Sequence, residues 1–533
     1  MAPPTSLGSV PPEGASPGLG RPGPGAFLRD LPVLILGLGD SGLAMARWCA
    51  HCGAQVSVWD SRETPPGAGA LAAELPNIPL RGGALTAASL GGAQLVLKSP
   101  GLAPMDARIA PLLQQARATG IAVLGELDLF ARALADLKES QGYAPKLLAI
   151  TGTNGKTTTT AMTALLVQRA GKRVAMAGNI GPTLLDTLSA RLQDLPEVWV
   201  LELSSFQLEG GGTGVQRGAL GFEPSAATVL NLTQDHLDWH GSMAAYQAAK
   251  ARVFGQQGCL VINRGDPLVE ALVPAPVPAK GRGKPIARPV IRFGLDAPRR
   301  PGDFGLVVEN GMAWLVRALP AEEGVKRRKD DDEEIHLQHL MPADALRVRG
   351  RHNAANALAA LALATAIGCP LAPMLHGLRE YAGEPHRVQF ITRIDEVEAF
   401  DDTKGTNVGA TVAALDGLGA DKAPSRLVVI LGGQGKGQDF APLTAPLQRH
   451  ARAVATLGVD AAAIEAMIPA GLPFQRHATL PEAVAWCLAQ AQPGDALLLS
   501  PACASLDMFR NYVHRGVVFQ QTVLELARAR GQA

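Results

Sequence analysis

The sequence lacks an excess of charge of either sign, a cysteine framework and a long apolar run. Its 533 residues carry 49 Lys and Arg against 48 Asp and Glu, which argues against a nucleic-acid or anionic membrane surface as partner. The six cysteines are scattered, and the N-terminus has none of the regions of a signal peptide. We therefore expect a cytoplasmic protein that binds small molecules and inserts into no membrane.

A CxxC pair and a long apolar stretch could indicate a metal or redox site and a membrane span, but packing inside the protein explains both better. Cys49 and Cys52 have a CxxC spacing, but they fall late in a predicted helix with no second ligand pair nearby. Packing is therefore favoured over metal or redox chemistry. The most apolar long stretch, residues 357–368, is too short and too rich in alanine to span a bilayer, so it predicts a buried helix.

The pattern along the chain predicts an α/β protein with about three domains, the number expected from its length. Residues 1–27 are rich in proline, glycine and serine and are expected to form a disordered tail. Strands then alternate with helices, which is typical of parallel sheets with ligands at the C-terminal ends of the strands. The predicted domains cover residues 28–134, 135–383 and 384–533.

Apolar runs place the individual elements. Strands are expected at 32–39, 55–60, 94–100, 121–126, 147–150, 173–181, 198–205, 226–233, 259–266, 397–402, 426–433, 453–458 and 495–501. Helices are expected at 41–53, 127–140, 158–171 and 352–368. Between about 268 and 345 the regular spacing is lost, and the charge run at 326–334 predicts a solvated loop.

Residues 151–157 read TGTNGKT, a glycine-rich loop between a predicted strand and a predicted helix. Gly152 and Gly155 allow backbone N–H groups to turn toward an anion. Lys156 can reach terminal phosphate oxygens, and the Thr157 hydroxyl can bind Mg²⁺ at the start of the helix. The first glycine of the usual phosphate-loop pattern is missing, so the loop is a variant. It predicts a nucleoside triphosphate site.

A second glycine-rich loop, GLGDSG at 37–42, ends the first predicted strand, and Asp60 ends the next one. Taken alone, this pattern is a dinucleotide fingerprint and supports a nicotinamide-dependent oxidoreductase as an alternative. The same loop can hold the pyrophosphate of any nucleotide conjugate, however, and an oxidoreductase has no use for the loop at 151–157. The two loops together favour one nucleotide-linked substrate and a separate nucleoside triphosphate.

Polar residues also follow strands of the second predicted domain. Glu202 ends the strand VWVLE, and His236 lies just beyond another strand, in NLTQDHLDWH. A carboxylate and an imidazole at neighbouring strand ends, facing Thr157, form a plausible ligand set for Mg²⁺. The alternative for His236 is a loop histidine that caps the next helix. Lys250, in AAKARVF, has no evident role from physics alone, because its ammonium group would repel a divalent metal.

Several motifs in order resemble the Mur ligases, the ATP-dependent amino-acid-adding enzymes of peptidoglycan synthesis. They are TGTNGKT, GNIG (178–181), LELSSFQLE (201–209), NLTQDHLDWH, AAKARVF and GRHNAANALAAL (350–361). In the C-terminal third, the segments that resemble the D-glutamate-adding members are DDTKGTN (401–407), LGGQGKGQDF (431–440) and LSPACASLDMFRNYVHRG (499–516). The resemblance covers about residues 28–533, apart from 268–345.

The resemblance implies both a fold and a reaction. The fold is an N-terminal Rossmann-like domain, a central phosphate-loop ATPase-type α/β domain and a C-terminal Rossmann-like α/β domain, in a monomeric cytoplasmic enzyme. The implied reaction adds D-glutamate to UDP-N-acetylmuramoyl-L-alanine through an acyl phosphate that ATP supplies. Another Mur-type ligase, or a ligase of the folylpolyglutamate synthase type, is the alternative within this class.

The resemblance also implies roles for single residues. The residues assigned to ATP are Gly152, Thr153, Asn154, Gly155, Lys156, Thr157, Thr158, Asn353, Asn356, Arg387, Asp402 and Lys404. Two Mg²⁺ ions are expected, with the ligands Thr157, Glu202, His236 and Lys250. Lys250 is expected as a carbamate, which turns a repelled cation into an anionic ligand. The residues with catalytic roles are Lys156, Asn179, His236 and Lys250.

Substrate contacts are implied in the first and third predicted domains. The uridine diphosphate end is assigned to Ser41, Ser61, Arg62, Ser99 and Gly101. D-glutamate is assigned to Thr406, Lys436, Ser505 and the Leu506 backbone, with Tyr512 packed nearby. Two residues depart from the family pattern. Asp40 is acidic beside a diphosphate that it should repel, and Ser61 stands where threonine is commoner.

Overall fold

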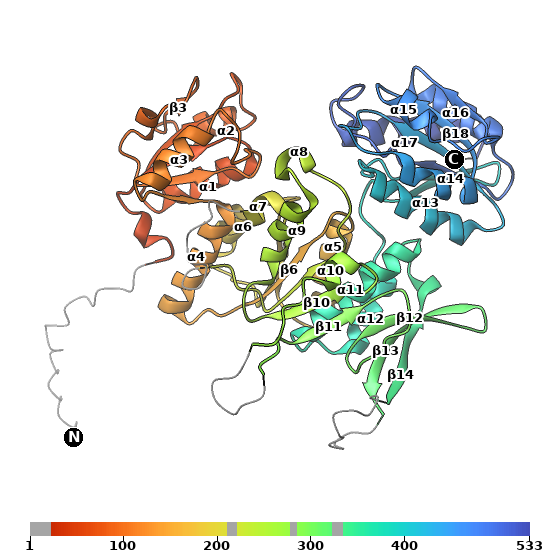
Figure 1. Cartoon of the computed structure of the whole chain (residues 1–533), viewed down its shortest axis with the longest axis horizontal. Helices are drawn as coiled ribbons and strands as arrows, with labels where there is room; N and C mark the ends of the chain where they lie inside the picture. The colour runs from red at the N-terminus through yellow and green to blue at the C-terminus, as the bar shows by residue number, and fades with distance from the viewer. Residues whose placement is uncertain (1–22, 210–220, 278–284, 322–333, 533) are drawn as a thin grey trace, which may run out of the picture.

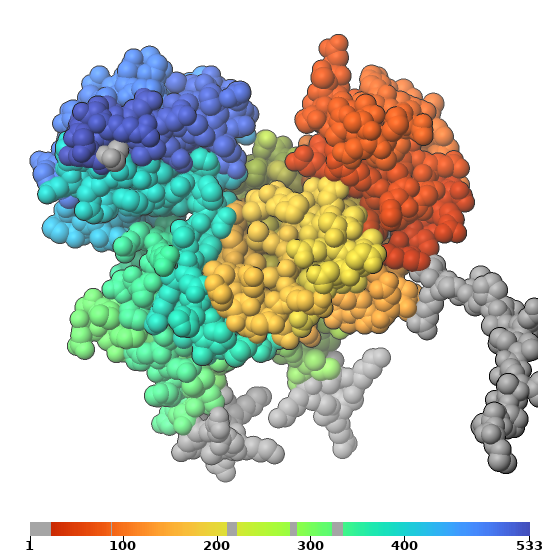
Figure 2. Space-filling view, turned by 180° about the vertical axis from the view of Figure 1, so that it is seen from behind, coloured from red at the N-terminus to blue at the C-terminus, as the bar shows by residue number. Residues whose placement is uncertain are grey.

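The strands form four sheets in the computed structural model, which describes residues 23–209, 221–277, 285–321 and 334–532. Three of the sheets are mainly parallel and flanked by helices, as predicted for α/β domains (Figure 1). We call the parts of the chain built on them the first, middle and third domains. Figures 1 and 2 show that the first and third domains both lie on the same side of the middle domain.

The first domain has a five-stranded parallel sheet in the order β3-β2-β1-β4-β5. The inner strands are almost entirely buried, as their apolar runs predict for a sheet covered on both faces. Its elements are β1 (Pro32–Leu36), α1 (Asp40–His51), β2 (Gln55–Trp59), α2 (Ala68–Glu74), β3 (Leu80–Arg81), β4 (Leu95–Lys98), α3 (Ala110–Ala118), β5 (Ala122–Leu124) and the connecting helix α4 (Glu126–Gln141).

The middle domain has a six-stranded parallel sheet in the order β11-β10-β9-β6-β8-β7. Its strands are β6 (Lys146–Thr151), β7 (Val174–Gly178), β8 (Val198–Glu202), β9 (Ala226–Val229), β10 (Cys259–Asn263) and β11 (Val290–Phe293). From β6 the chain first builds β7 and β8 on one side and then crosses to β9 on the other. The C-terminal end of β6 is therefore the point where strand order reverses, the usual ligand site of an open α/β sheet.

The helices of the middle domain surround this sheet. They are α5 (Lys156–Arg169), α6 (Leu184–Arg191), α7 (Ser205–Glu209), α8 (Leu237–His240), α9 (Met243–Ala251), α10 (Pro267–Glu270), α11 (Arg351–Ala366) and α12 (Leu371–Glu380). Residues 357–364 of α11 are fully buried, so the prediction of a buried alanine-rich helix is confirmed. Its small side chains let α11 pack closely against α5.

The third domain has a six-stranded sheet in the order β15-β16-β20-β17-β18-β19, in which only β15 is antiparallel to its neighbour. Its elements are β15 (Gln389–Ile394), β16 (Val397–Asp401), α13 (Val408–Lys422), β17 (Leu427–Gly432), α14 (Thr444–His450), β18 (Ala451–Leu457), α15 (Ala461–Glu465), β19 (Phe474–Arg476), α16 (Leu480–Gln490), β20 (Ala496–Leu499) and α17 (Tyr512–Ala529). Every strand predicted in the three domains is present, and the α/β fold class is confirmed.

Part of the stretch for which the sequence predicted no regular structure is a sheet. Strands β12 (Phe304–Glu309), β13 (Met312–Pro320) and β14 (Ile335–Pro342) form an antiparallel sheet beside the middle domain (Figure 1). Asn310 and Gly311 join the first two strands with positive φ angles of 52° and 79°. An Asn-Gly pair between strands is a strong hairpin signal, which the sequence prediction overlooked.

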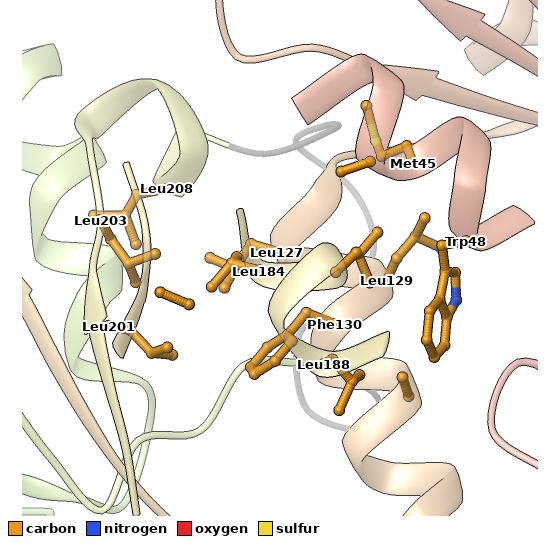
Figure 3. Close-up of a cluster of buried hydrophobic side chains, with 14 of the residues drawn as sticks. Met45, Trp48, Leu127, Leu129, Phe130, Leu184, Leu188, Leu201, Leu203 and Leu208 are labelled. Atoms are coloured by element: carbon orange, nitrogen blue, oxygen red, sulfur yellow. The ribbon is translucent and has the colours of Figure 1, made fainter. Parts of the chain in front are cut away.

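One hydrophobic core joins the first and middle domains. Figure 3 shows Trp48 of α1, Phe130 of α4 and Leu184 of α6 in the same buried cluster. The ring of Phe130 meets the ring of Trp199 edge-on, with centroids 5.1 Å apart. Because each large apolar side chain contributes about 1.5–3 kcal/mol when buried, separating the two domains would be costly. The two domains are therefore expected to behave as one unit.

The third domain meets the middle domain through a polar contact instead. Its two core clusters contain only residues of the third domain itself. At the start of α13, the side-chain amides of Asn407 and Asn154 donate to each other, with N to O distances of 3.2 and 3.4 Å. Further along, a Cβ on Gly417 would approach the ring of His352 to 2.6 Å. No hydrophobic core cluster among the described residues spans this contact, so it is suited to opening and closing.

Three other predictions concern single segments. Residues 1–22 of the predicted tail and all but the last residue of the charge run lie outside the described residues, while η1 (Ala26–Leu28) begins the described fold. Cys49 is buried in the core, and Cys52 packs against it. No helix in the described ranges has the length and apolarity needed to cross a bilayer.

Candidate active site

The loop TGTNGKT connects the central strand β6 to α5. Gly152 and Gly155 have φ angles of 151° and 82°, which side chains rarely adopt. A Cβ on Gly155 would also lie only 2.6 Å from Oδ1 of Asn356. The Nζ of Lys156 donates to the carbonyl oxygens of Gly152 and Thr153, both at 2.9 Å, so this side chain lies over the loop. Burial lowers the pKa of Lys156.

A cavity of about 330 Å³ lies in front of this loop and is lined by the middle and third domains. We call it the central cavity. The predicted site residues that line it are Thr153, Asn154, Gly155, Lys156, Thr157, Asn179, Glu202, His236, Arg387, Lys404, Thr406 and Lys436. The fold therefore brings residues assigned to ATP, to the metal and to D-glutamate into one space.

Glu202 is the buried anchor of the central cavity. Its side chain is almost fully buried at the end of β8. The hydroxyl of Thr157 donates to one carboxylate oxygen at 2.9 Å, and the amide of Asn179 donates to the other at 3.0 Å. The guanidinium of Arg387, from the third domain, donates to the Thr157 hydroxyl. A carboxylate, a hydroxyl and a guanidinium thus meet at the start of α5.

His236 lies on the wall of the central cavity, but its strand is not next to that of Glu202. Strand β6 lies between β8 and β9, so the prediction of neighbouring strand ends was wrong. His236 occupies the N-cap position of α8 without a side-chain capping bond. Its ring packs 4.7 Å from the ring of Phe206, centroid to centroid. Burial lowers its pKa, which favours the neutral imidazole that can bind a metal.

Lys250 lies beneath the loop and is not among the residues that line the central cavity. Its side chain on α9 is almost fully buried. The Nζ donates to the carbonyl of Gly152 at 2.8 Å and to the hydroxyl of Thr151 at 3.4 Å, and it lies 4.7 Å from the ring centroid of Tyr246. Burial, reinforced by the charge of Lys156, lowers the pKa of Lys250 well below its usual value.

A second cavity, of about 250 Å³, also borders the loop, at Asn154 and Gly155. We call it the asparagine-lined cavity, because Asn154, Asn231, Asn263, Asn353 and Asn356 contribute to its wall. The amide of Asn356 donates to Oδ1 of Asn353 at 3.1 Å. The other predicted ATP residues that line this cavity are Gly155, Thr158, Arg387, Asp402 and Lys404.

Asp402 and Lys404 of the third domain are both perturbed by burial. The hydroxyl of Ser500 donates to Asp402 at 2.6 Å, but burial is the larger effect and raises the pKa of Asp402 to about 7. The Nζ of Lys404 lies 3.9 Å from the ring centroid of Tyr512. Burial lowers the pKa of Lys404 to about 8. Both groups therefore titrate near neutral pH.

The raised pKa of Asp402 predicts a cost to stability at high pH. In the unfolded chain Asp402 has the usual aspartate pKa of 3.8, whereas the folded protein keeps the proton up to about pH 7. Folding stability therefore falls between these two pH values, by on the order of a few kcal/mol. Replacing Asp402 with asparagine should raise the urea midpoint at pH 8 and leave it almost unchanged near pH 4, as measured by urea unfolding at both pH values.

A matched control is the exposed carboxylate of Asp439 in the same domain. Asp439→Asn removes the same charge without removing a buried one, so it should give no gain at pH 8. An Asp402→Asn variant that is no more stable than the parent protein at pH 8 would contradict the raised pKa.

A third cavity, of about 670 Å³, faces the C-terminal end of the first sheet. We call it the first-domain cavity. All five residues assigned to the uridine diphosphate end line it: Ser41, Ser61, Arg62, Ser99 and Gly101. Asn179, Lys404 and Tyr512 reach it from the other two domains. Asp40, the acidic departure from the family pattern, is exposed on the same wall.

Asp60 has a structural role that the oxidoreductase alternative did not anticipate. Its carboxylate accepts the backbone N–H of Leu38 at 2.7 Å and that of Arg62 at 2.8 Å. The guanidinium of Arg62 donates to both of its oxygens. These donors lower the pKa of Asp60 to about 2 against the effect of burial. The carboxylate is thus committed to the protein and not open to a ribose hydroxyl.

The residues assigned to D-glutamate are only partly brought together. Thr406 and Lys436 line the central cavity, and Tyr512 lines the first-domain cavity. Ser505 is buried, whereas the side chain of Leu506 is 63% exposed. Both follow Ala504, which lines the central cavity, but they line none of the three cavities themselves.

Sequence reasoning missed several polar residues at these cavities. Asp235, Asn407 and Gln438 line the central cavity, and Asn231 lines the asparagine-lined cavity. The amide of Asn231 bonds to the backbone N–H and carbonyl of Asn154, at 2.8 and 3.1 Å. All four lie inside motifs that the sequence analysis had already singled out. Their polar amide and carboxylate side chains could have identified them as further candidate site residues.

Comparison with known proteins gives family matches along most of the chain. The Mur ligase middle domain matches residues 150–364, the Mur ligase MurD-like N-terminal domain matches 32–125, and the Mur ligase glutamate ligase domain matches 386–503.

The relatives that match nearly the full length include two that are named UDP-N-acetylmuramoylalanine–D-glutamate ligase. The protein of Albidiferax ferrireducens is 60% identical over 511 residues, covering 95% of this chain and 98% of the relative. That of Burkholderia mallei is 55% identical over 512 residues, covering 94% and 98%.

Solved structures show the same fold at much lower identity. The MurF ligase of Thermotoga maritima in complex with ADP has a TM-score of 0.55 and 16% identity, covering 94% of this chain and 96% of that one. The UDP-N-acetylmuramate-alanine ligase of the same organism has a TM-score of 0.51 and 20% identity, covering 93% and 99%. The chain therefore belongs to the Mur ligase family, and the relatives that match nearly its whole length are UDP-N-acetylmuramoylalanine–D-glutamate ligases.

Proposed function

We propose that this chain joins D-glutamate to UDP-N-acetylmuramoyl-L-alanine, with ATP as the energy source, in the cytoplasmic synthesis of peptidoglycan precursors. The main support is the loop at 151–157, whose Lys156 and Thr157 face Glu202 and the third-domain Arg387 in one cavity. The name of the full-length relatives supports the choice of substrates.

The chemistry requires that the substrate carboxylate be activated first, because oxide is a poor leaving group. The alanyl carboxylate attacks the γ-phosphate of ATP, so ADP leaves and an acyl phosphate forms. The amine of D-glutamate then attacks the acyl carbon, and phosphate leaves from the tetrahedral intermediate. Lys156, Arg387 and Lys404 line the central cavity, where their charge would stabilise the transferring phosphoryl group.

The residues at the start of α5 fit a magnesium ion. Glu202 and Thr157 offer hard oxygen donors 2.9 Å apart, and Mg²⁺ usually takes one or two protein oxygens, with phosphate and water completing the shell. No group of three or more His, Cys, Asp or Glu converges in the described part of the chain, which agrees with such a shared shell. His236, on the same cavity, would serve a second ion. The metal would neutralise charge on the phosphates.

Lys250 is proposed to act as a carbamate. Carbamate formation needs a neutral amine, and the burial that lowers its pKa favours that form. The modified side chain would be anionic, so it would offset the positive charge of Lys156 rather than add to it. Its N–H would still donate to the carbonyl of Gly152.

The remaining assignments follow the three cavities. Residues 28–134 would bind the uridine diphosphate end in the first-domain cavity, and residues 135–383 would bind ATP, with adenine in the asparagine-lined cavity. Residues 384–533 would bind D-glutamate near Thr406 and Lys436. The third domain would close along α13 to exclude water from the acyl phosphate, so closure should control turnover. We propose that the enzyme acts as a monomer.

The proposed reaction is tested with UDP-N-acetylmuramoyl-L-alanine, ATP and Mg²⁺ in the presence of D-glutamate or L-glutamate. Phosphate release and the mass of the nucleotide product are measured. Release should depend on D-glutamate, and the product should gain one glutamate residue. Equal release with both enantiomers, or none with D-glutamate, would contradict the proposal.

A further inference from the structure

Arg108 is a cation on the wall of the first-domain cavity to which no role has been assigned. It precedes α3 and is 47 residues from Ser61 in the sequence, yet its Nη1 donates to the hydroxyl of Ser61 at 2.9 Å. Ser61 is itself assigned to the uridine diphosphate end. The contact therefore places a guanidinium beside a proposed substrate residue.

The guanidinium of Arg108 is held in place by a neighbour. The Nε donates to both carboxylate oxygens of Asp106, at 2.9 and 3.1 Å, and Nη2 donates to one of them. The backbone N–H of Arg108 also donates to Asp106 at 2.9 Å. Because a guanidinium is planar, fixing one edge on Asp106 sets the direction of the other. That other edge is the one that meets Ser61.

Four charged residues of the first domain line the first-domain cavity. Among the first-domain residues that line it, the cations are Arg62 and Arg108 and the anions are Asp40 and Asp60. Arg62 donates to Asp60 through both Nε and Nη2, so that pair is internally balanced. Asp40 adds an exposed negative charge to a wall that must receive an anionic nucleotide. Arg108 is paired with Asp106 in the same way, but Asp106 does not line the cavity, and Nη1 of Arg108 remains at the cavity wall beside Ser61. Lys404 of the third domain is a further cation on this wall.

We infer that Arg108, with Ser61, binds the nucleoside diphosphate end of the substrate. The inference rests on the proposed function, because it takes its ligand from that reaction. A guanidinium has five N–H donors, so one held by Asp106 and Ser61 still matches the oxygens of a diphosphate. The exposure of its side chain, 59%, leaves it open to solvent and so to a ligand.

The test is direct binding of UDP-N-acetylmuramoyl-L-alanine to the full-length protein by calorimetry, beside steady-state kinetics. Arg108→Ala should weaken binding and raise KM for this substrate by on the order of tenfold, a charged hydrogen bond being worth about that much. The KM values for ATP and D-glutamate and the thermal midpoint should not change. Arg117→Ala removes the same charge from an exposed position of α3 in the same domain and should have no effect.

Two outcomes separate failure of this inference from failure of the proposed function. If the parent protein does not bind the nucleotide substrate, the proposed function is wrong. If the parent protein and Arg108→Ala bind it equally well, Arg108 is not a contact.

Discussion

Replacing Lys156 with alanine should reduce kcat by at least about a thousandfold while the fold stays intact, because removing one electrostatic stabiliser of a transition state typically costs that much. Among the described residues, Nζ of Lys156 bonds to the loop carbonyls of Gly152 and Thr153. Because these bonds lie within one loop and Lys156 belongs to no hydrophobic core cluster, the substitution should leave the rest of the fold intact. Its lowered pKa shows that burying the charge is itself costly. Phosphate release and thermal unfolding measure the two effects separately.

Lys146 provides the matched control for this experiment. It lies on the same strand, β6, but its side chain is exposed. Lys146→Ala should keep the activity of the parent protein. A Lys156→Ala protein that retains a tenth or more of the parent activity would contradict the proposed role, whereas a large fall in its thermal midpoint would assign Lys156 to the fold instead.

Replacing Lys250 with alanine should also leave almost no activity, but this loss should be partly reversible. The substitution removes the proposed carbamate and opens a space beneath the loop, beside Gly152 and Tyr246. Small carboxylic acids such as acetate or formate can enter such a space and replace the missing anion. Activity should therefore rise with acid concentration, measured as phosphate release at constant ionic strength.

The contrast between the two lysines makes this test specific. Acetate should not restore Lys156→Ala, because that side chain supplies a positive charge. Failure of every short-chain acid to restore Lys250→Ala would count against the carbamate. Equal recovery of both variants would show a general salt effect and would also contradict it.

The parallel sheets could be predicted because their strands are uninterrupted apolar runs followed by polar residues. The sequence 147–150 is followed directly by TGTNGKT, and the structure places that loop at the end of the central strand β6. The order of the strands in the sheet was harder to predict, because sequence separation does not reveal which strands pair. Glu202 and His236 therefore seemed to lie on neighbouring strands, although β6 separates them.

The antiparallel sheet β12–β14 shows a different limit. Strand β14 has polar residues at several positions and is mostly half-buried, whereas β12 contains a short apolar run, FGLVV, that the sequence prediction did not assign to a strand. The local signal was the turn at Asn310 and Gly311, which is visible only when turn chemistry is examined on its own.

The residues of the candidate site are brought together by contacts between distant parts of the chain, which no local sequence pattern predicts. Motifs located Lys156 and Glu202, because strand ends and loops are short-range features. The bond from Arg387 to Thr157 joins two domains across 230 residues, and the burial of Lys250 depends on how α9 packs. Family resemblance anticipated these residues, whereas periodicity could not. Neither family resemblance nor periodicity identified Arg108, because its partner Ser61 is distant in sequence.

The central claim is that the substrate carboxylate is phosphorylated before the amide forms, and isotope transfer tests it most directly. UDP-N-acetylmuramoyl-L-alanine is labelled with ¹⁸O in its alanyl carboxylate and converted in the presence of ATP, Mg²⁺ and D-glutamate. Mass spectrometry of the released phosphate should then find one ¹⁸O atom for each amide bond formed. Unlabelled phosphate, with the label retained in the product or lost to water, would contradict the acyl phosphate and with it the proposed reaction.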